Sequence, residues 1–118
     1  MNRRDNTIDY IEFPGTSAVG VAAAKVFYGR VFGWSFKDWG ADYIDTRSSG
    51  TNCGFSADSA HCPRAPLAVI YVADLESALT EVQAAGGQIS RGIFAFPGGH
   101  RFHFIDPAGN ELAVWSDQ

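Results

Sequence analysis

The stretch Phe102-His103-Phe104-Ile105-Asp106-Pro107-Ala108-Gly109-Asn110-Glu111-Leu112, near the end of the 118-residue chain, has the pattern of two strands joined by a turn. Asp106 can accept hydrogen bonds from the backbone that follows it, and Pro107 fixes its own φ angle. Gly109 and Asn110 tolerate the positive φ angles that tight turns require. The stretch therefore predicts a closing β-hairpin in which aromatic side chains before the turn alternate with polar ones.

A second stretch, Val26-Phe27-Tyr28-Gly29-Arg30-Val31-Phe32-Gly33-Trp34, predicts the end of a helix. Apolar residues recur at helical spacing from 17 to 32. Gly33 can end this helix because glycine adopts the left-handed conformation without a Cβ clash. The periodicity also places Phe27 and Phe32 on the buried side of the helix.

The order strand, helix, strand, strand, strand occurs twice along the chain, offset by about 57 residues when Ser17 is aligned with Asp74. In the first copy we expect a strand at 10–14, the helix at 17–32, an extended run that begins at 34–36, and strands at 43–46 and 52–56. In the second copy we expect a strand at 67–72, a helix between Asp74 and Gly86, and strands at 88–95, 101–106 and 111–115. The sequence thus predicts one α+β domain over 1–118, with modules at 7–58 and 66–117 and a connector at 59–65.

Together with Ile11-Glu12-Phe13-Pro14 and Phe96-Pro97-Gly98-Gly99, the two quoted stretches resemble the vicinal-oxygen-chelate superfamily. This superfamily includes glyoxalase I, bleomycin-resistance proteins and extradiol dioxygenases, and the similarity is greatest to its glyoxalase-like subgroup. The resemblance implies paired β-α-β-β-β modules whose curved mixed sheets form a cup, and a homodimer. Because this fold hosts many chemistries, it implies much less about the function.

The composition excludes several classes of partner. A formal charge of −4, a pI of about 5.1 and scattered basic residues oppose a phosphate-binding surface, so we expect no nucleic-acid partner. No apolar run approaches the roughly 20 residues of a membrane helix, and no apolar segment follows the N-terminal arginines as in a secretory signal. We therefore expect a cytoplasmic protein with no membrane partner, and reduced thiols at Cys53 and Cys62.

The resemblance also bears on metal binding. Metal-dependent relatives place ligands about seven residues before the helix cap of each module and on the last strand of each module. Here those positions fall on Tyr10, Leu67 and Ala113, and strand 52–56 offers only Cys53 as a donor. Since a catalytic divalent cation needs three or more protein donors, we expect the usual metal site to be missing and no cofactor to be bound.

Strand alternation predicts a polar face within the cup. It places Tyr10 and Glu12 on the face opposite Ile11 and Phe13, the apolar pair expected under the helix. The same rule places Arg101 and His103 on the face opposite Phe102 and Phe104. The expected site has Glu12 and His103 as catalytic residues and Tyr10, Tyr71, Arg101, Glu111 and Trp115 as substrate-binding residues.

Plain structural roles compete with these assignments. Glu12 and Arg101 could form an ion pair that closes the sheet, since a carboxylate turned inward without a partner is costly. His103 could be a hydrogen-bonded strand histidine rather than a catalyst. His100 and His103 should face opposite sides of their strand, so we do not expect them to chelate a metal together.

Three functions remain open from the sequence. The first is a metal-independent lyase, isomerase or dioxygenase-like enzyme in which Glu12 or His103 acts as general base on a small carbonyl or aromatic compound. The second is a non-catalytic protein that binds or sequesters an antibiotic-like small molecule. We expect this ligand to be aromatic and cationic, since the protein is rich in aromatic rings and carries a negative net charge. The third is a metalloenzyme with displaced ligands that involve Glu12, His103 or Glu111.

Overall fold

The computed structural model describes residues 3–58 and 63–118, and in it the chain divides into two units. One consists of residues 10–67 and is called here the α1 unit. The other, the α2 unit, combines residues 1–9 with 68–118. His61 and Cys62 of the predicted connector lie outside the described residues, so the reduced thiol expected at Cys62 stays a prediction.

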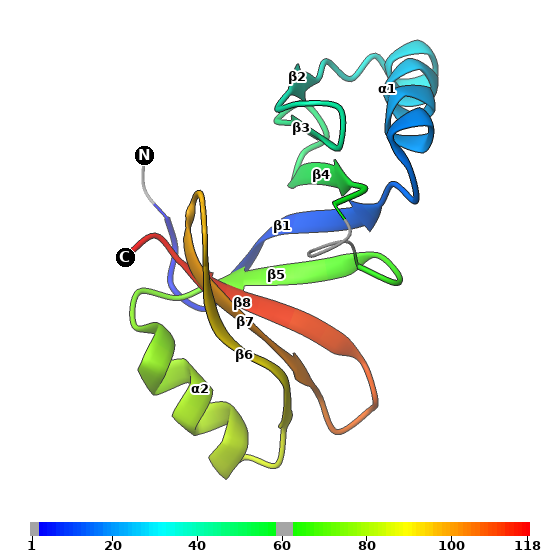
Figure 1. The fold of residues 1–118 in the computed structure, drawn as a ribbon. Helices are drawn as coiled ribbons and strands as arrows, with labels where there is room; N and C mark the ends of the chain where they lie inside the picture. The colour runs from blue at the N-terminus through cyan, green and yellow to red at the C-terminus, as the bar shows by residue number, and fades with distance from the viewer. Residues whose placement is uncertain (1–2, 59–62) are drawn as a thin grey trace. The chain divides into compact units, whose positions relative to one another are not determined.

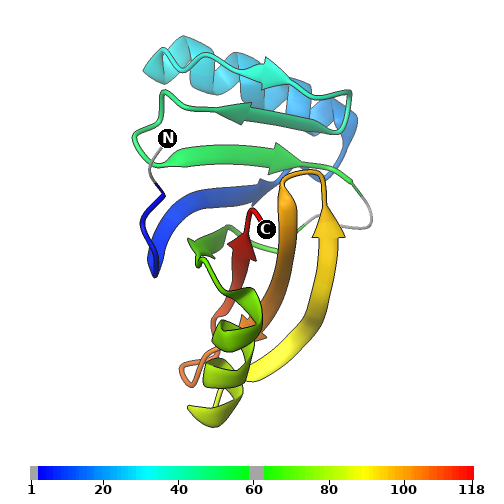
Figure 2. The same ribbon diagram turned by 90° about the vertical axis from the view of Figure 1, so that its left-hand side faces the viewer.

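The α1 unit has a helix and four strands in the order predicted for the first module (Figure 1). Its elements are β1 (Thr7–Pro14), which begins in the α2 unit, α1 (Ala18–Phe32), β2 (Lys37–Asp38), β3 (Tyr43–Thr46) and β4 (Asn52–Ser56). The strand order is β2-β3-β4-β1, with β1 parallel to β4 and the other pairs antiparallel. A mixed sheet therefore forms within this unit, with α1 running alongside it (Figure 2).

The α2 unit repeats this arrangement. Its elements are β5 (Leu67–Tyr71), α2 (Leu75–Ala84), β6 (Gln88–Phe96), β7 (Gly99–Ile105) and β8 (Glu111–Ser116). The strand order is β5-β8-β7-β6, with β5 parallel to β8 and the other pairs antiparallel. The predicted α+β class and the two β-α-β-β-β units are thus confirmed.

Local sequence signals account for the helix boundaries. The Ser17 hydroxyl accepts a hydrogen bond from the backbone N–H of Gly20 at 3.0 Å, and Gly33 ends α1 with φ 73°. The Asp74 carboxylate caps α2 in the same way by accepting from the Ser77 N–H. Each helix therefore starts at the residue that aligns the two copies of the sequence pattern, and α1 ends at Gly33 as predicted. The extended segment expected at 34–36 is wrong in position, because pairing with β3 begins only at Lys37.

The closing hairpin depends on one carboxylate. Asp106 Oδ1 accepts from the backbone N–H groups of Ala108 and Asn110 at 2.8 and 2.9 Å, and Gly109 has φ 92°. These backbone hydrogen bonds favour the ionised carboxylate and lower the pKa of Asp106. The predicted role of this segment as a turn is confirmed.

Each helix covers one face of the sheet in its own unit. Val21 packs with Ile44 and Phe55 under α1, while Phe102 and Val114 pack with Leu75 under α2. The burial expected for Phe27 and Phe32 is wrong, since their exposed fractions are 55% and 60%. The buried stripe of α1 consists of residues 21, 24 and 28, so Phe27 points away from it and Phe32 stands at the last turn of the helix. Within the described residues, no helix is both long and apolar enough to cross a membrane.

Candidate functional site

The face of the α2 unit that lies opposite α2 carries most of the predicted site residues. Because Phe102 is fully buried on the helix side, Arg101 and His103 project from the other side of β7. Arg101 is paired in register with Trp115, and Trp115 with Tyr71 on β5. One face thus carries Arg101, His103, Tyr71 and Trp115, as alternation predicted. Glu111, the first residue of β8, reaches His103.

Arg101 and His103 form a buried pair at the centre of this face. Their exposed fractions are 7% and 9%. Arg101 donates from Nε and Nη2 to His103 Nε2, at 3.2 and 2.9 Å. Since a guanidinium has no acceptor, Nε2 must be the unprotonated nitrogen of the ring, and the proton lies on Nδ1. His103 Nδ1 is 3.7 Å from Glu111 Oε2, which also accepts from the Ser90 hydroxyl at 2.9 Å.

This geometry keeps His103 neutral. Burial, followed by the positive charge of Arg101, lowers the pKa of His103 to about 4, against the smaller opposing effect of Glu111. A neutral imidazole can accept the two guanidinium hydrogen bonds throughout the physiological pH range. His103 therefore orients Arg101, and its lone pair is already engaged. The sequence suggested a hydrogen-bonded histidine but did not identify its partner.

Aromatic rings flank the Arg101 guanidinium. Its Cζ atom lies 5.7 Å from the ring centroid of Phe94 and 5.8 Å from that of Phe96, both on β6. Arg91, also on β6, lies 3.8 Å from the Phe94 centroid. Phenyl faces attract cations and exclude water, so they strengthen the electrostatic interactions of the guanidinium. Strand alternation did not predict Arg91, Phe94 or Phe96 as site residues, because a bulged strand shifts the register on which alternation relies.

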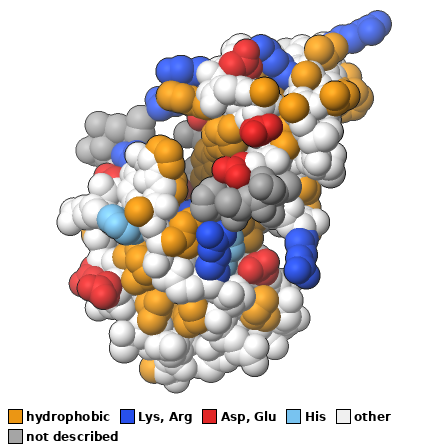
Figure 3. Space-filling model, viewed as in Figure 1, with side chains coloured by type: hydrophobic (Ala, Val, Ile, Leu, Met, Phe, Trp, Pro, Cys, Tyr) orange, Lys and Arg blue, Asp and Glu red, His pale blue; other side chains and the backbone are white. Residues whose placement is uncertain are grey.

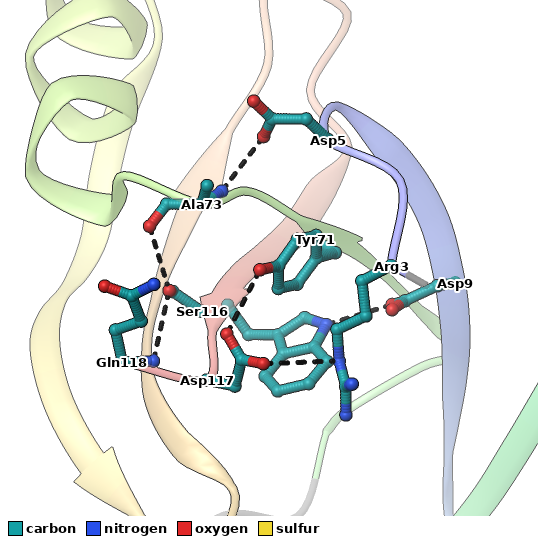
Figure 4. Close-up of polar contacts among 9 residues, drawn as sticks. Arg3, Asp5, Asp9, Tyr71, Ala73, Ser116, Asp117 and Gln118 are labelled. Carbon is teal, nitrogen blue, oxygen red and sulfur yellow. Dashed lines mark hydrogen bonds and ion pairs between the residues drawn. The ribbon is translucent and has the colours of Figure 1, made fainter. Parts of the chain in front are cut away.

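Tyr71 and Trp115 form a second group on the same face. Figure 4 shows Tyr71 there together with Arg3 and Asp117. Their rings meet edge to face, with centroids 5.3 Å apart. Tyr71 donates its hydroxyl hydrogen to Asp117 at 3.1 Å, and burial together with this carboxylate raises the pKa of Tyr71. Arg3 lies over both rings. Arg3 and Asp117 belong to chain ends, where no periodicity marks a residue, so only the structure identifies them.

Tyr10 and Glu12 belong to the α1 unit, on the face of its sheet opposite α1. Glu12 has an exposed fraction of 5% and is aligned with Gly54 of β4. The hydroxyl of Tyr10 is hydrogen-bonded to that of Tyr43. Burial, with further contributions from Tyr43, Asp45 and Glu12, raises the pKa of Tyr10. Whether Glu12 pairs with Arg101 stays a prediction.

The positions implied for a metal do not present a matching donor set. Leu67 and Ala113 are buried and have no ligand atom, while the Cys53 thiol donates to the Thr51 carbonyl and accepts from Ser49. Among the residues that the structure describes, no three His, Cys, Asp or Glu side chains gather as a cation would require. The usual site of metal-dependent relatives therefore does not fit these residues.

A hollow of about 530 Å³ lies between α2 and its sheet, lined by apolar side chains of both and by Asp5, Asp74 and Glu81. None of the predicted site residues lines it. The predicted site residues that belong to the α2 unit lie on the opposite face of its sheet.

Comparison with known proteins agrees with this architecture. The model of the Glyoxalase/Bleomycin resistance protein/Dioxygenase superfamily matches residues 17–114. The chain belongs to this superfamily. The predicted resemblance is thereby confirmed, although a search of the curated proteins finds no match.

Solved structures of low sequence identity share the fold. An NAD-dependent benzaldehyde dehydrogenase from Legionella pneumophila has a TM-score of 0.74 at 12% identity, over 91% of this chain and 96% of that one. Methylmalonyl-CoA epimerase from Mycobacterium tuberculosis has a TM-score of 0.69 at 11% identity, over 98% and 92%. The Mn(II)-bound glyoxalase from Novosphingobium aromaticivorans has a TM-score of 0.68 at 20% identity, and the match covers 97% of this chain but 40% of that protein. At these identities the comparisons establish the fold alone.

We predict that Gly54→Ala destabilises the protein. A Cβ atom at this position would overlap the hydroxyl oxygens of Tyr10 and Tyr43 and lie 2.8 Å from Tyr10 Cζ. Overpacking of this kind costs about 1–3 kcal/mol. Gly92→Ala is the matched control, because a Cβ added there would meet nothing within 4 Å, and we expect a change within about 0.5 kcal/mol. Equal free energies of unfolding in urea for the two variants would contradict this packing.

We also predict a pH-dependent contribution of His103 to stability. Because its pKa falls from 6.5 to about 4 on folding, the unfolded chain binds more protons than the folded one between these values. The stability that depends on neutral His103 is therefore present above pH 6.5 and is lost as the pH falls toward 4. The destabilisation caused by His103→Gln should consequently shrink between pH 7.5 and pH 5.

Free energies of unfolding measured in urea at the two pH values check this prediction. His100→Gln, at an exposed position of the same strand, provides the reference for loss of an imidazole outside the network. If His103→Gln lowers the free energy of unfolding by the same amount at both pH values, folding does not hold His103 neutral.

Proposed function

We propose that the protein is a lyase- or isomerase-like enzyme that acts on a small carbonyl compound without a metal. The observation that supports this most is the buried Arg101 guanidinium, which His103 orients and two phenyl rings shield. Such a donor suits the negative charge that develops on a carbonyl oxygen when a neighbouring carbon loses a proton.

The proposal assigns three roles. Arg101 stabilises the developing oxyanion, and His103 positions Arg101. Glu12, buried and on a strand face beside two tyrosines, is the proposed general base, because a carboxylate there can accept a proton from a substrate carbon. Tyr10, Tyr71, Glu111 and Trp115 remain our proposed substrate-binding residues.

A non-catalytic binding protein is the second candidate. The aromatic rings around Trp115, at 5.3 Å from Tyr71 and 6.1 Å from Phe96, favour it, since such rings hold flat or cationic compounds without any chemistry. A cytoplasmic location remains our expectation from the sequence.

The activity test measures exchange of hydrogen for deuterium at the carbon beside the carbonyl group. Proton NMR monitors this exchange in D₂O for a panel of small oxo compounds. We predict that Arg101→Lys lowers the exchange rate about 10²–10³-fold, because the charge remains but the planar fork of donors is lost. Glu12→Gln should abolish exchange while preserving the fold, and Arg47→Lys, an exposed control, should retain the full rate.

Three outcomes decide between the candidates. Exchange that survives chelator treatment and fails in the Arg101 and Glu12 variants supports the proposal. Binding without exchange supports a sequestering protein. The third outcome is exchange that requires a metal, with that metal found at stoichiometric level by elemental analysis. This would overturn the metal-independent proposal and support a metalloenzyme with displaced ligands.

We further propose a homodimer, in which the exposed side of α1 contacts a second copy. Five apolar side chains of this helix are more than half exposed, and apolar atoms are visible on this part of the surface (Figure 3). They are Val19, Val26, Phe27, Val31 and Phe32. Exposed apolar surface of this extent often marks a protein–protein interface.

We predict that Val26→Asp converts the dimer to a monomer, because a buried unpaired carboxylate at the interface is costly. Light scattering after gel filtration should show twice the 12.7 kDa chain mass for the wild type and the mass of one chain for this variant. Ile93→Asp, at an exposed position on β6, should remain dimeric. A monomeric wild type would refute this proposal.

A further inference from the structure

We propose that Tyr71, Trp115 and Asp117 form a binding site for a planar guanidinium-type cation, and that Arg3 occupies it as an internal ligand. The proposal concerns binding alone and does not rest on the enzyme activity proposed above. At this group of residues the N-terminal segment meets the end of β8 (Figure 4).

The first observation is the position of the guanidinium. Arg3 Cζ lies 4.8 Å from the ring centroid of Trp115 and 5.9 Å from that of Tyr71. Tyr71 and Phe96 stand against Trp115 at interplanar angles of 68° and 66°. Trp115 thus presents a face to the cation and Tyr71 lies beside it, which is how aromatic side chains hold organic cations.

The second observation is the arrangement of carboxylates. Asp117 Oδ2 is 3.9 Å from Arg3 Nε, and Asp117 Oδ1 accepts from the Tyr71 hydroxyl. Asp9 Oδ1 accepts from the Trp115 indole N–H at 2.9 Å. Two carboxylates are therefore held in place by the aromatic residues themselves, independently of Arg3. A cation placed over Trp115 offsets the negative charge of these carboxylates.

The third observation is that Arg3 is not needed to anchor its own segment. Asn6 donates its backbone N–H to the Tyr71 carbonyl at 2.9 Å, and Asp5 Oδ1 accepts from the Ala73 N–H at the same distance. The Arg3 side chain remains 31% exposed, and its ion pair is long. Exposed pairs of this kind are weak, so a free cation of the same shape can displace the arginine.

The test compares the wild type with Arg3→Gln, using N-methylguanidinium as the probe at constant ionic strength. The readout is the NMR signal of the Trp115 indole N–H, identified by its loss in Trp115→Phe. We expect the probe to bind Arg3→Gln about fivefold more tightly than the wild type, because the competing internal ligand is gone. Arg4→Gln, an exposed neighbour, should bind like the wild type.

Two controls separate a cation site from general ring stacking. N-methylurea, a neutral molecule of the same shape, should produce no saturable shift. Asp117→Asn in the Arg3→Gln background should weaken binding of the probe. The proposal is overturned if Arg3→Gln and the wild type respond alike, if the urea binds equally well, or if the Trp115 signal does not move. These results leave the Arg101-dependent exchange reaction untouched, so the two proposals fail separately.

Discussion

Burial of Phe102 against α2 is the constraint on which the candidate site depends. Its side chain is fully buried beside Val114 and Leu75. Because successive side chains of a strand point to opposite faces, this burial places Arg101 and His103 on the other side of β7. A slip of one residue in the pairing with β8 would exchange the two faces. The apolar core of the α2 unit therefore sets the orientation of the polar groups.

The second constraint is electrostatic. Arg101 is buried, and a buried cation is tolerated only where polar partners and aromatic faces replace water. His103 supplies an acceptor because it stays neutral, and it stays neutral because it is buried with Arg101 beside it. Each residue thus stabilises the state that the other requires. This mutual dependence supports a positioning role for His103 better than the role of a base whose lone pair is free.

The two units use the same topology to different effect. On the face opposite its helix, the α1 unit has tyrosine hydroxyls directly over Gly54 together with the buried Glu12. The corresponding face of the α2 unit has an arginine, a histidine and aromatic rings. A shared β-α-β-β-β order therefore constrains which positions face away from the helix, and the residues at those positions differ in charge. This is why membership in the superfamily leaves the chemistry open.

The sequence by itself determined the elements whose signals are local: the helix starts at Ser17 and Asp74, the Gly33 helix end, the Asp106 turn and the alternation that separates Arg101 from Phe102. These depend on neighbours within a few residues. Only the tertiary structure decided which distant groups meet, such as Arg3 with Trp115 and Arg101 with Phe94, and that Phe27 is exposed. Such contacts depend on strand register, bulges and the reach of long side chains, and none of these is encoded in a periodic pattern.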